Sequence, residues 1–219
     1  MAMSDPLPLS EIFDHLPVSS VELTVQRNDE ISISGGAEYF QNELADPLWT
    51  GPFTLGTGKH AELKRAAALI RSLRGSQQAF LICDPTSLWP QADPKGLILG
   101  NANVTIRSVP SSRAIAPLTG LRAAYKLTAG DKMQITYDNP VKYAFVEVSR
   151  DVTANANGQA DVAVFPWLPL SLIAGAKVTL IRPACPVVIV KDTHRPGTAR
   201  NTITENASFT VIERRRRAL

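Results

Sequence analysis

The chain has 219 residues, of which 44% are hydrophobic, 20% charged and 6% aromatic, and its formal net charge is +3. This composition is that of a folded globular protein and excludes a disordered chain, which would be poorer in apolar residues and more highly charged. Two cysteines, Cys83 and Cys185, are too few for a disulfide framework and lack metal-ligand spacing, so we expect two buried thiols. No apolar run is long enough for a spanning helix and the N-terminus lacks a signal-peptide pattern. We therefore expect a protein that folds in a cytoplasm and has no membrane span.

The first section of the chain is rich in turn residues and in period-two patterns. Residues 1–17 contain several Pro and Asp residues and are predicted to form an N-terminal arm or loop. Alternation of apolar and polar residues predicts short strands over residues 21–25, 31–34 and 47–55. Asn28-Asp29 is expected to form the turn between the first two strands.

One helix is predicted, over about residues 59–73. Its apolar positions fall on a single stripe at helical spacing, namely Leu63, Ala66, Ala67, Ile70 and Leu73. Arg71 and Arg74 suit the negative end of the helix dipole, and Gly75 is a suitable residue to end the helix. The apolar run 79–83 follows and predicts a buried strand that stops at Asp84-Pro85.

From about residue 96 the pattern changes to short strands separated by turns, with no helix between them. Strands are predicted over residues 103–109, 125–127, 132–137, 143–148, 160–165 and 177–181. Asn157-Gly158 is a favoured type I′ hairpin turn and is expected to join residues 148–155 to 160–165. This regular spacing predicts a small OB-like β-barrel over residues 97–183.

The last section, residues 184–219, predicts strands over 186–190, 202–204 and 208–212. We expect this section to return and pair with the first one. The fold class is then mostly β: a split β-sandwich or barrel domain from residues 18–96 and 184–219, with one short helix, and the small barrel inserted into it.

The sequence contains no pattern that predicts catalysis. Residues 51–60 contain Gly58-Lys59, a pair found in phosphate-binding loops, but Thr57 stands where the spacing from Gly51 and Gly56 requires Lys. The three histidines lack neighbours at metal-ligand spacing; they are His15, His60 and His194. A carboxylate pair for glycoside hydrolysis would have to be brought together by the fold, and carboxylates in strands and turns are more commonly solvated surface charges. The candidates are Asp131, Glu147, Asp151 and Asp161. We therefore predict no catalytic, cofactor-binding or metal-binding residue, no cofactor, and no enzymatic activity.

Two other features allow more than one interpretation. The three tryptophans, Trp49, Trp89 and Trp167, could stack on sugars or could anchor the core or an interface. The basic run Arg214–Arg217 could contact phosphates, an acidic patch of a neighbouring subunit, or solvent.

The order of several short motifs resembles the distal tail proteins of siphophages and related prophage tail proteins. The N-terminal motifs are Pro47-Leu48-Trp49-Thr50-Gly51, Ser72-Leu73-Arg74-Gly75 after the helix, and residues 80–85 (FLICDP). The later motifs resemble the small barrel that some of these proteins carry: residues 127–131 (LTAGD), Tyr143, Ala156-Asn157-Gly158, Val164-Phe165-Pro166 and 175–178 (GAKV).

The resemblance implies a structural subunit of the phage tail tip. Such proteins form rings, typically hexamers, that join the tail tube protein to the baseplate hub protein around a channel through which DNA passes. It implies that residues 18–96 and 184–219 form the ring, that the chain resides in the virion after assembly in the host cytoplasm, and that contact with DNA is passive. The alternative is a non-enzymatic module whose inserted barrel binds host polysaccharide or nucleic acid.

Overall fold

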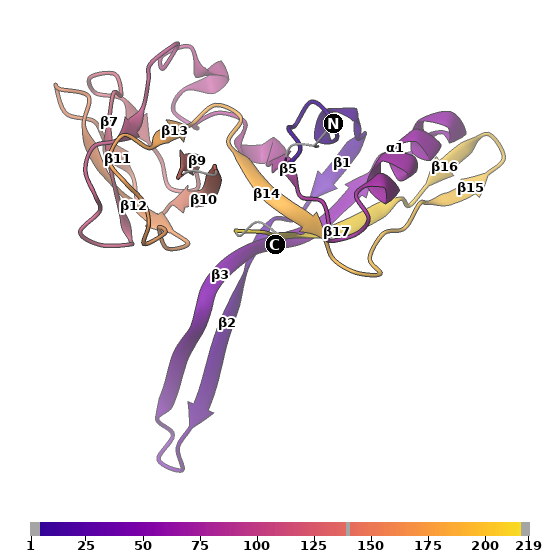
Figure 1. Ribbon diagram of the computed structural model, residues 1–219, viewed down its shortest axis with the longest axis horizontal. Coiled ribbons are helices and arrows are strands. Elements are labelled where there is room, and N and C mark those ends of the chain that lie inside the picture. The colour runs from indigo at the N-terminus through magenta and orange to yellow at the C-terminus, as the bar shows by residue number, and fades with distance from the viewer. Residues whose placement is uncertain (1–4, 139–140, 216–219) are drawn as a thin grey trace.

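The computed structural model describes residues 5–138 and 141–215. These residues form a mostly β protein with one α-helix, in which a curled half-barrel sheet lies beside a closed six-strand antiparallel barrel (Figure 1). The predicted fold class, mostly β with one helix and an inserted small barrel, is confirmed. Within the described ranges, no helix is long and apolar enough to cross a membrane.

The half-barrel sheet is built from both ends of the chain. Its strand order is β1-β3-β17-β14-β5, and β2 also pairs with β3. The bounds are β1 Val18–Val21, β2 Thr24–Ile33, β3 Tyr39–Leu55, β5 Phe80–Cys83, β14 Ala184–Ile189 and β17 Ser208–Glu213. Since β17 pairs antiparallel with β3, from Ser208 opposite Thr54 to Ile212 opposite Thr50, the predicted return of the last section to the first is confirmed.

The core of this sheet is aromatic and includes part of the predicted arm. The rings of Phe53 and Phe209 stack with centroids 5.4 Å apart, and Phe13 meets Phe53 edge-on. Leu7 is buried and forms a parallel bridge to Phe80. Residues 5–17 are therefore packed against the sheet rather than extended as a free arm, because Leu7, Ile12, Phe13 and Leu16 are buried in its core. Residues 1–4 of the predicted arm lie outside the described residues.

The helix α1, His60–Ser72, agrees with the predicted span to within one residue at each end. Its buried stripe is Leu63, Ala66, Ala67 and Ile70. A small sheet of order β15-β16-β4 lies beside it, formed by β4 Gly58–Lys59, β15 Thr198–Arg200 and β16 Ile203–Glu205. His60 joins the two, because its Nδ1 lies 2.7 Å from the Thr204 hydroxyl and its Nε2 lies 2.8 Å from the Asn201 carbonyl.

The barrel closes in the order β10-β12-β7-β6-β13-β9. Its strands are β6 Thr105–Ile106, β7 Ile115–Thr119, β9 Lys132–Tyr137, β10 Lys142–Val148, β12 Ala160–Phe165 and β13 Lys177–Thr179. It has one strand more than the five of an OB-fold, so what the structure has in common with the prediction is a small closed barrel. The sequence missed β7 because Pro117 interrupts its pattern, and proline is rare inside paired strands.

The remaining elements are short. β8 Lys126–Leu127 pairs with β11 Val152–Thr153. Asn157-Gly158 lies in a turn before β12, where the Asn155 N–H donates to the Gln159 carbonyl and Gly158 has a φ of +69°, but Asn157 does not have the positive φ of the expected type I′ turn. The 3-10 turns are η1 Phe13–His15, η2 Pro85–Ser87 and η3 Pro94–Gly96.

The first predicted turn is wrong. Strand β2 runs through Asn28 and Asp29 with only a shift of register, and the chain reverses at residues 34–38 instead. There the Ser34 hydroxyl accepts hydrogen bonds from the backbone N–H groups of Gly36 and Glu38, and Ala37 has a positive φ of 61°. The pattern also missed residues 39–46, which extend β3 well before its predicted start.

Candidate assembly site

The β2–β3 hairpin projects from the body of the molecule as a two-stranded ribbon (Figure 1). Over residues 39–49, the only described strand that pairs with β3 is β2. Large apolar side chains are exposed along the ribbon, and Ile33 and Leu44 are the most open, at 67% and 68% exposed; the others are Ile31, Tyr39 and Phe40.

Both faces of this hairpin carry apolar groups. Ile33 pairs directly with Tyr39, so these two side chains share one face, and Phe40, the next residue, points to the other. A two-stranded hairpin alone in water is marginally stable, and exposed strand edges pair readily with other chains. The ribbon therefore exposes apolar side chains on both faces and strand edges that no other described strand pairs with.

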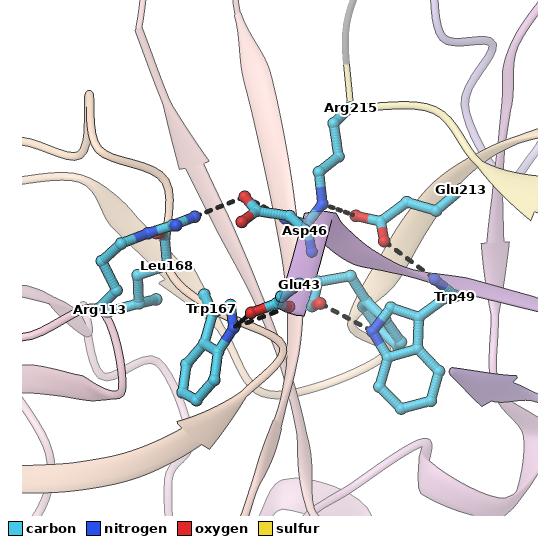
Figure 2. A network of polar contacts seen from close by, with 9 residues as sticks. Glu43, Asp46, Trp49, Arg113, Trp167, Leu168, Glu213 and Arg215 are labelled. Carbon is cyan, nitrogen blue, oxygen red and sulfur yellow. Dashed lines mark hydrogen bonds and ion pairs between the residues drawn. The ribbon is translucent and has the colours of Figure 1, made fainter. Parts of the chain in front are cut away.

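The base of the hairpin is held by ion pairs to the barrel and to the C-terminal segment (Figure 2). Asp46 accepts hydrogen bonds from Arg113, in the barrel segment before β7, and from Arg215, whose Nη1 lies 3.2 Å from Asp46 Oδ2. Arg113 also donates from Nε to the Leu168 carbonyl at 2.7 Å. One carboxylate thus joins three parts of the chain.

A buried carboxylate lies next to this contact. The Glu213 side chain is 0% exposed; it accepts from Arg215 Nε at 3.0 Å and from the Trp49 backbone N–H at 3.1 Å. Burial raises the pKa of Glu213 above its ordinary value, although the Arg215 charge and these hydrogen bonds oppose that effect. Trp49 continues the connection, because its Nε1 donates to the Phe145 carbonyl of β10 at 2.9 Å and its ring packs edge-on against Phe145.

A second contact ties the hairpin itself to the barrel. Trp167 Nε1 donates to both oxygens of Glu43, at 2.9 and 3.1 Å (Figure 2). The Trp167 ring also packs edge-on against Phe165. With the Asp46 contacts, this fixes the direction in which the hairpin leaves the molecule.

The interface between sheet and barrel also contains a buried lysine. Lys132 Nζ lies 2.6 Å from Glu147 Oε2, 3.7 Å from Asp84 Oδ2 and 4.7 Å from the centroid of the Trp49 ring. Gln134, also on β9, accepts from the Ala184 backbone N–H at 2.8 Å.

The four carboxylates considered from the sequence have separate structural partners. Asp131 accepts from the backbone N–H groups of Gln91 and Thr128, both at 2.8 Å. The other three pair with basic side chains: Glu147 with Lys132, Asp151 with Lys126 and Asp161 with Arg107.

The histidines and cysteines lie in different environments. Among the described residues, no group of three or more His, Cys, Asp or Glu side chains could hold a metal ion. His15 is exposed, His60 joins α1 to the small sheet, and burial together with the nearby Arg71 charge lowers the pKa of His194. Both thiols are free and buried, as expected; burial raises the pKa of Cys83 to about 11, partly offset by Arg182, and raises that of Cys185.

The tryptophans and the basic run do not gather on one surface. Trp49 is buried at the junction, Trp167 contacts the hairpin, and Trp89 is half-exposed in the connection to the barrel. Arg214 bonds to Asp5 and to the Gln77 carbonyl, so it and Arg215 fold back onto this chain. Arg216 and Arg217 lie outside the described residues.

Sequence reasoning did not identify Glu43, Asp46, Phe145 or Glu213 as interacting residues. Each contacts a partner that is far from it along the chain, and these contacts form only because β17 lies beside β3 and the barrel lies against both. The available signal was local: residues 39–46 combine aromatic and acidic residues next to a Pro-Leu-Trp segment.

No family model matches this chain, and no curated protein matches it significantly.

Proposed function

We propose that this chain is a structural, non-enzymatic subunit that assembles with copies of itself into a closed ring, in the manner of the distal tail proteins that its motifs resemble. The observation that carries the proposal is the projecting β2–β3 hairpin, with apolar side chains on both faces and its strand edges free. A ring of identical subunits provides each hairpin with a neighbour that covers it.

The resemblance extends the proposal to a place in a virion. The ring then lies at the tip of a phage tail, joins the tail tube protein to the baseplate hub protein, and surrounds the channel for passing DNA. The body of the subunit suits this role, because ion pairs and buried side chains join its sheet to its barrel.

The test is to measure assembly of the purified protein and of a variant with a polar hairpin. Light scattering at several concentrations and negative-stain electron microscopy should show closed rings for the wild type. The variant Ile33→Ser/Phe40→Ser/Leu44→Ser should stay monomeric with an unchanged unfolding transition. A control, Val109→Ser/Leu170→Ser, changes exposed apolar residues of the barrel and should still form rings.

A wild-type protein that stays monomeric at every concentration would refute the assembly proposal. In that case the inserted barrel becomes the surface to examine, by glycan-array binding and by salt-dependent binding of single-stranded DNA.

A further inference from the structure

A groove runs beside helix α1 on the half-barrel part of the molecule. It consists of two adjoining hollows of about 410 and 470 Å³, which share Arg71. The first lies between α1 and the β15–β16 segment, and the second between the end of α1 and residues 189–194. Leu63, Ala67 and Ile70 line these hollows from the helix, so much of their floor is apolar.

The rim of this groove is mainly basic: Lys64, Arg71, Arg74 and Lys191 line it, with one carboxylate, Asp192, which lies 4.0 Å from Lys191 Nζ. Lys64, Arg71 and Arg74 are exposed, and within the part of the chain that the structure describes no carboxylate lies within ion-pair distance of them. The lowered pKa of His194, which also lines the groove, has the Arg71 charge as one of its causes. The groove therefore suits an occupant that is apolar along its centre and negatively charged at its sides.

The β2–β3 hairpin has this chemistry. Residues 24–55 contain five carboxylates and a single arginine, whereas residues 59–74 contain five Lys and Arg residues and a single Glu. In the projecting part Arg27 pairs with Asp29, while Glu30 and Glu38 are exposed beside the apolar side chains. An isolated carboxylate on an apolar ribbon gains most from a neighbouring cation in a partly buried contact.

The hairpin of a subunit is directed away from its own groove. Figure 1 shows it leaving the body on a different side from α1, and the contacts of Glu43 with Trp167 and of Asp46 with Arg113 hold its base against the barrel. Only another molecule can therefore bring a hairpin to this groove.

We propose that the α1 groove of one subunit receives the β2–β3 hairpin of a second copy of this chain, with Glu30 and Glu38 facing Lys64, Arg71 and Arg74. The apolar side chains of the hairpin cover the floor formed by α1. The contact is head-to-tail, because one surface meets a different surface, and such a contact closes into a ring when the rotation between subunits allows it. This inference rests on the proposed self-assembly and identifies the surface that accepts the hairpin.

Charge reversal on either side provides the test. The groove variant Arg71→Glu/Arg74→Glu and the hairpin variant Glu30→Lys/Glu38→Lys should each weaken self-association by about 100-fold, because like charges then face each other. The variant that carries all four changes should recover association, and so should an equimolar mixture of the two double variants. Association is measured by sedimentation velocity, and thermal unfolding checks that every variant folds.

The matched control is Arg122→Glu/Arg150→Glu, which reverses two exposed arginines of the barrel part and should leave association unchanged. If wild type and all variants associate equally, the groove is not the acceptor, although assembly itself stands. If the wild type does not associate at all, both proposals fail. If the groove variant instead loses salt-dependent binding of a short DNA duplex while association is unchanged, the groove is a nucleic-acid site and the inference is overturned.

Discussion

The barrel and the β2–β3 hairpin are both antiparallel β-structure, yet they differ in how far their strand edges are paired and their apolar side chains are buried. In the barrel every strand has a neighbour on each side, and its interior is filled by buried side chains such as Met133, Ile135 and Val162. In the projecting hairpin, β2 and β3 have only each other among the described strands, and their apolar side chains face water. A closed barrel pairs all its strand edges and buries its apolar side chains within itself. An open ribbon leaves strand edges and apolar side chains exposed unless another segment covers them.

This contrast divides the molecule into a body with a buried core and a hairpin with an exposed apolar surface, to which we assign the proposed association. Substitutions inside the body should lower the free energy of unfolding of the monomer. Substitutions on the hairpin should leave that free energy unchanged and alter the assembly.

The largest effect is expected where the barrel meets the sheet. Phe145 is fully buried and packs against Trp49 with ring centroids 5.5 Å apart. Phe145→Ala should lower the free energy of unfolding by about 4 kcal/mol, through lost burial and the cavity left behind. The measurement is urea denaturation of the monomer at low protein concentration.

The matched control replaces the same residue type on the hairpin. Phe40 is exposed, so Phe40→Ala should change the free energy of unfolding by less than about 0.5 kcal/mol. Equal losses for the two variants would show that the hairpin is part of the folding unit and would remove the distinction drawn above.

A smaller effect is expected at the buried lysine of the same interface. Lys132→Met removes the cation between Asp84 and Glu147 and should cost about 3 kcal/mol. This is the low end for a broken buried ion pair, because Glu147 keeps contact with water. Thermal and urea unfolding should agree on the loss.

The exposed ion pair of Arg107 on the barrel surface serves as the comparison for the buried Lys132. It pairs with Asp161 in an exposed position, so Arg107→Met should cost less than about 1 kcal/mol. A loss as large as that of Lys132→Met would mean that the exposed pair has a structural role that its exposure does not indicate.

The same contrast explains how much the sequence predicts. Helix α1 and strand β12 follow from strong periodicity, because each buries one face against a core, and β9 follows from the alternation of Met133, Ile135 and Tyr137 with polar residues, although its polar face is also largely buried. Residues 39–46 have apolar groups on both faces and no buried side, so period-two alternation is absent there. The junction at Asp46 and Glu213 joins residues far apart in the chain, and no local pattern specifies such a contact.

The pH dependence of the free energy of unfolding should reveal the raised pKa of Glu213. Burial raises its pKa in the folded chain above the ordinary value of 4.5, so the folded state holds this proton over a pH range where the unfolded state has released it. The contribution of Glu213 to the free energy of unfolding therefore falls as pH rises from about 4.5 through the raised folded pKa, and it is constant above. Glu213→Gln does not titrate.

Urea denaturation of both proteins at intervals between about pH 4 and pH 7 is the measurement. The difference in stability, wild type minus Glu213→Gln, should decrease as pH rises. A difference that is constant across this range, or that increases with pH, would contradict a raised pKa at this carboxyl.

The smallest expected effect concerns chemical labelling of the two cysteines, which should not occur in the native protein. The thiolate is the reactive form of cysteine, and burial raises the pKa of Cys83 to about 11 and also raises that of Cys185. Native protein at about pH 8 should therefore show no labelling of either thiol by a small disulfide reagent, and in unfolded protein both thiols should be labelled.

Two variants compare the hairpin with the core in this labelling assay. The variant Ile33→Ser/Phe40→Ser/Leu44→Ser should remain as unreactive as the wild type, since Cys83 and Cys185 lie in the core of the half-barrel sheet. Phe145→Ala should accelerate labelling, because Phe145 belongs to that same core and its loss increases the population of open states. Faster labelling in the hairpin variant would show that the ribbon supports the core, and the two regions would then have to be treated as one.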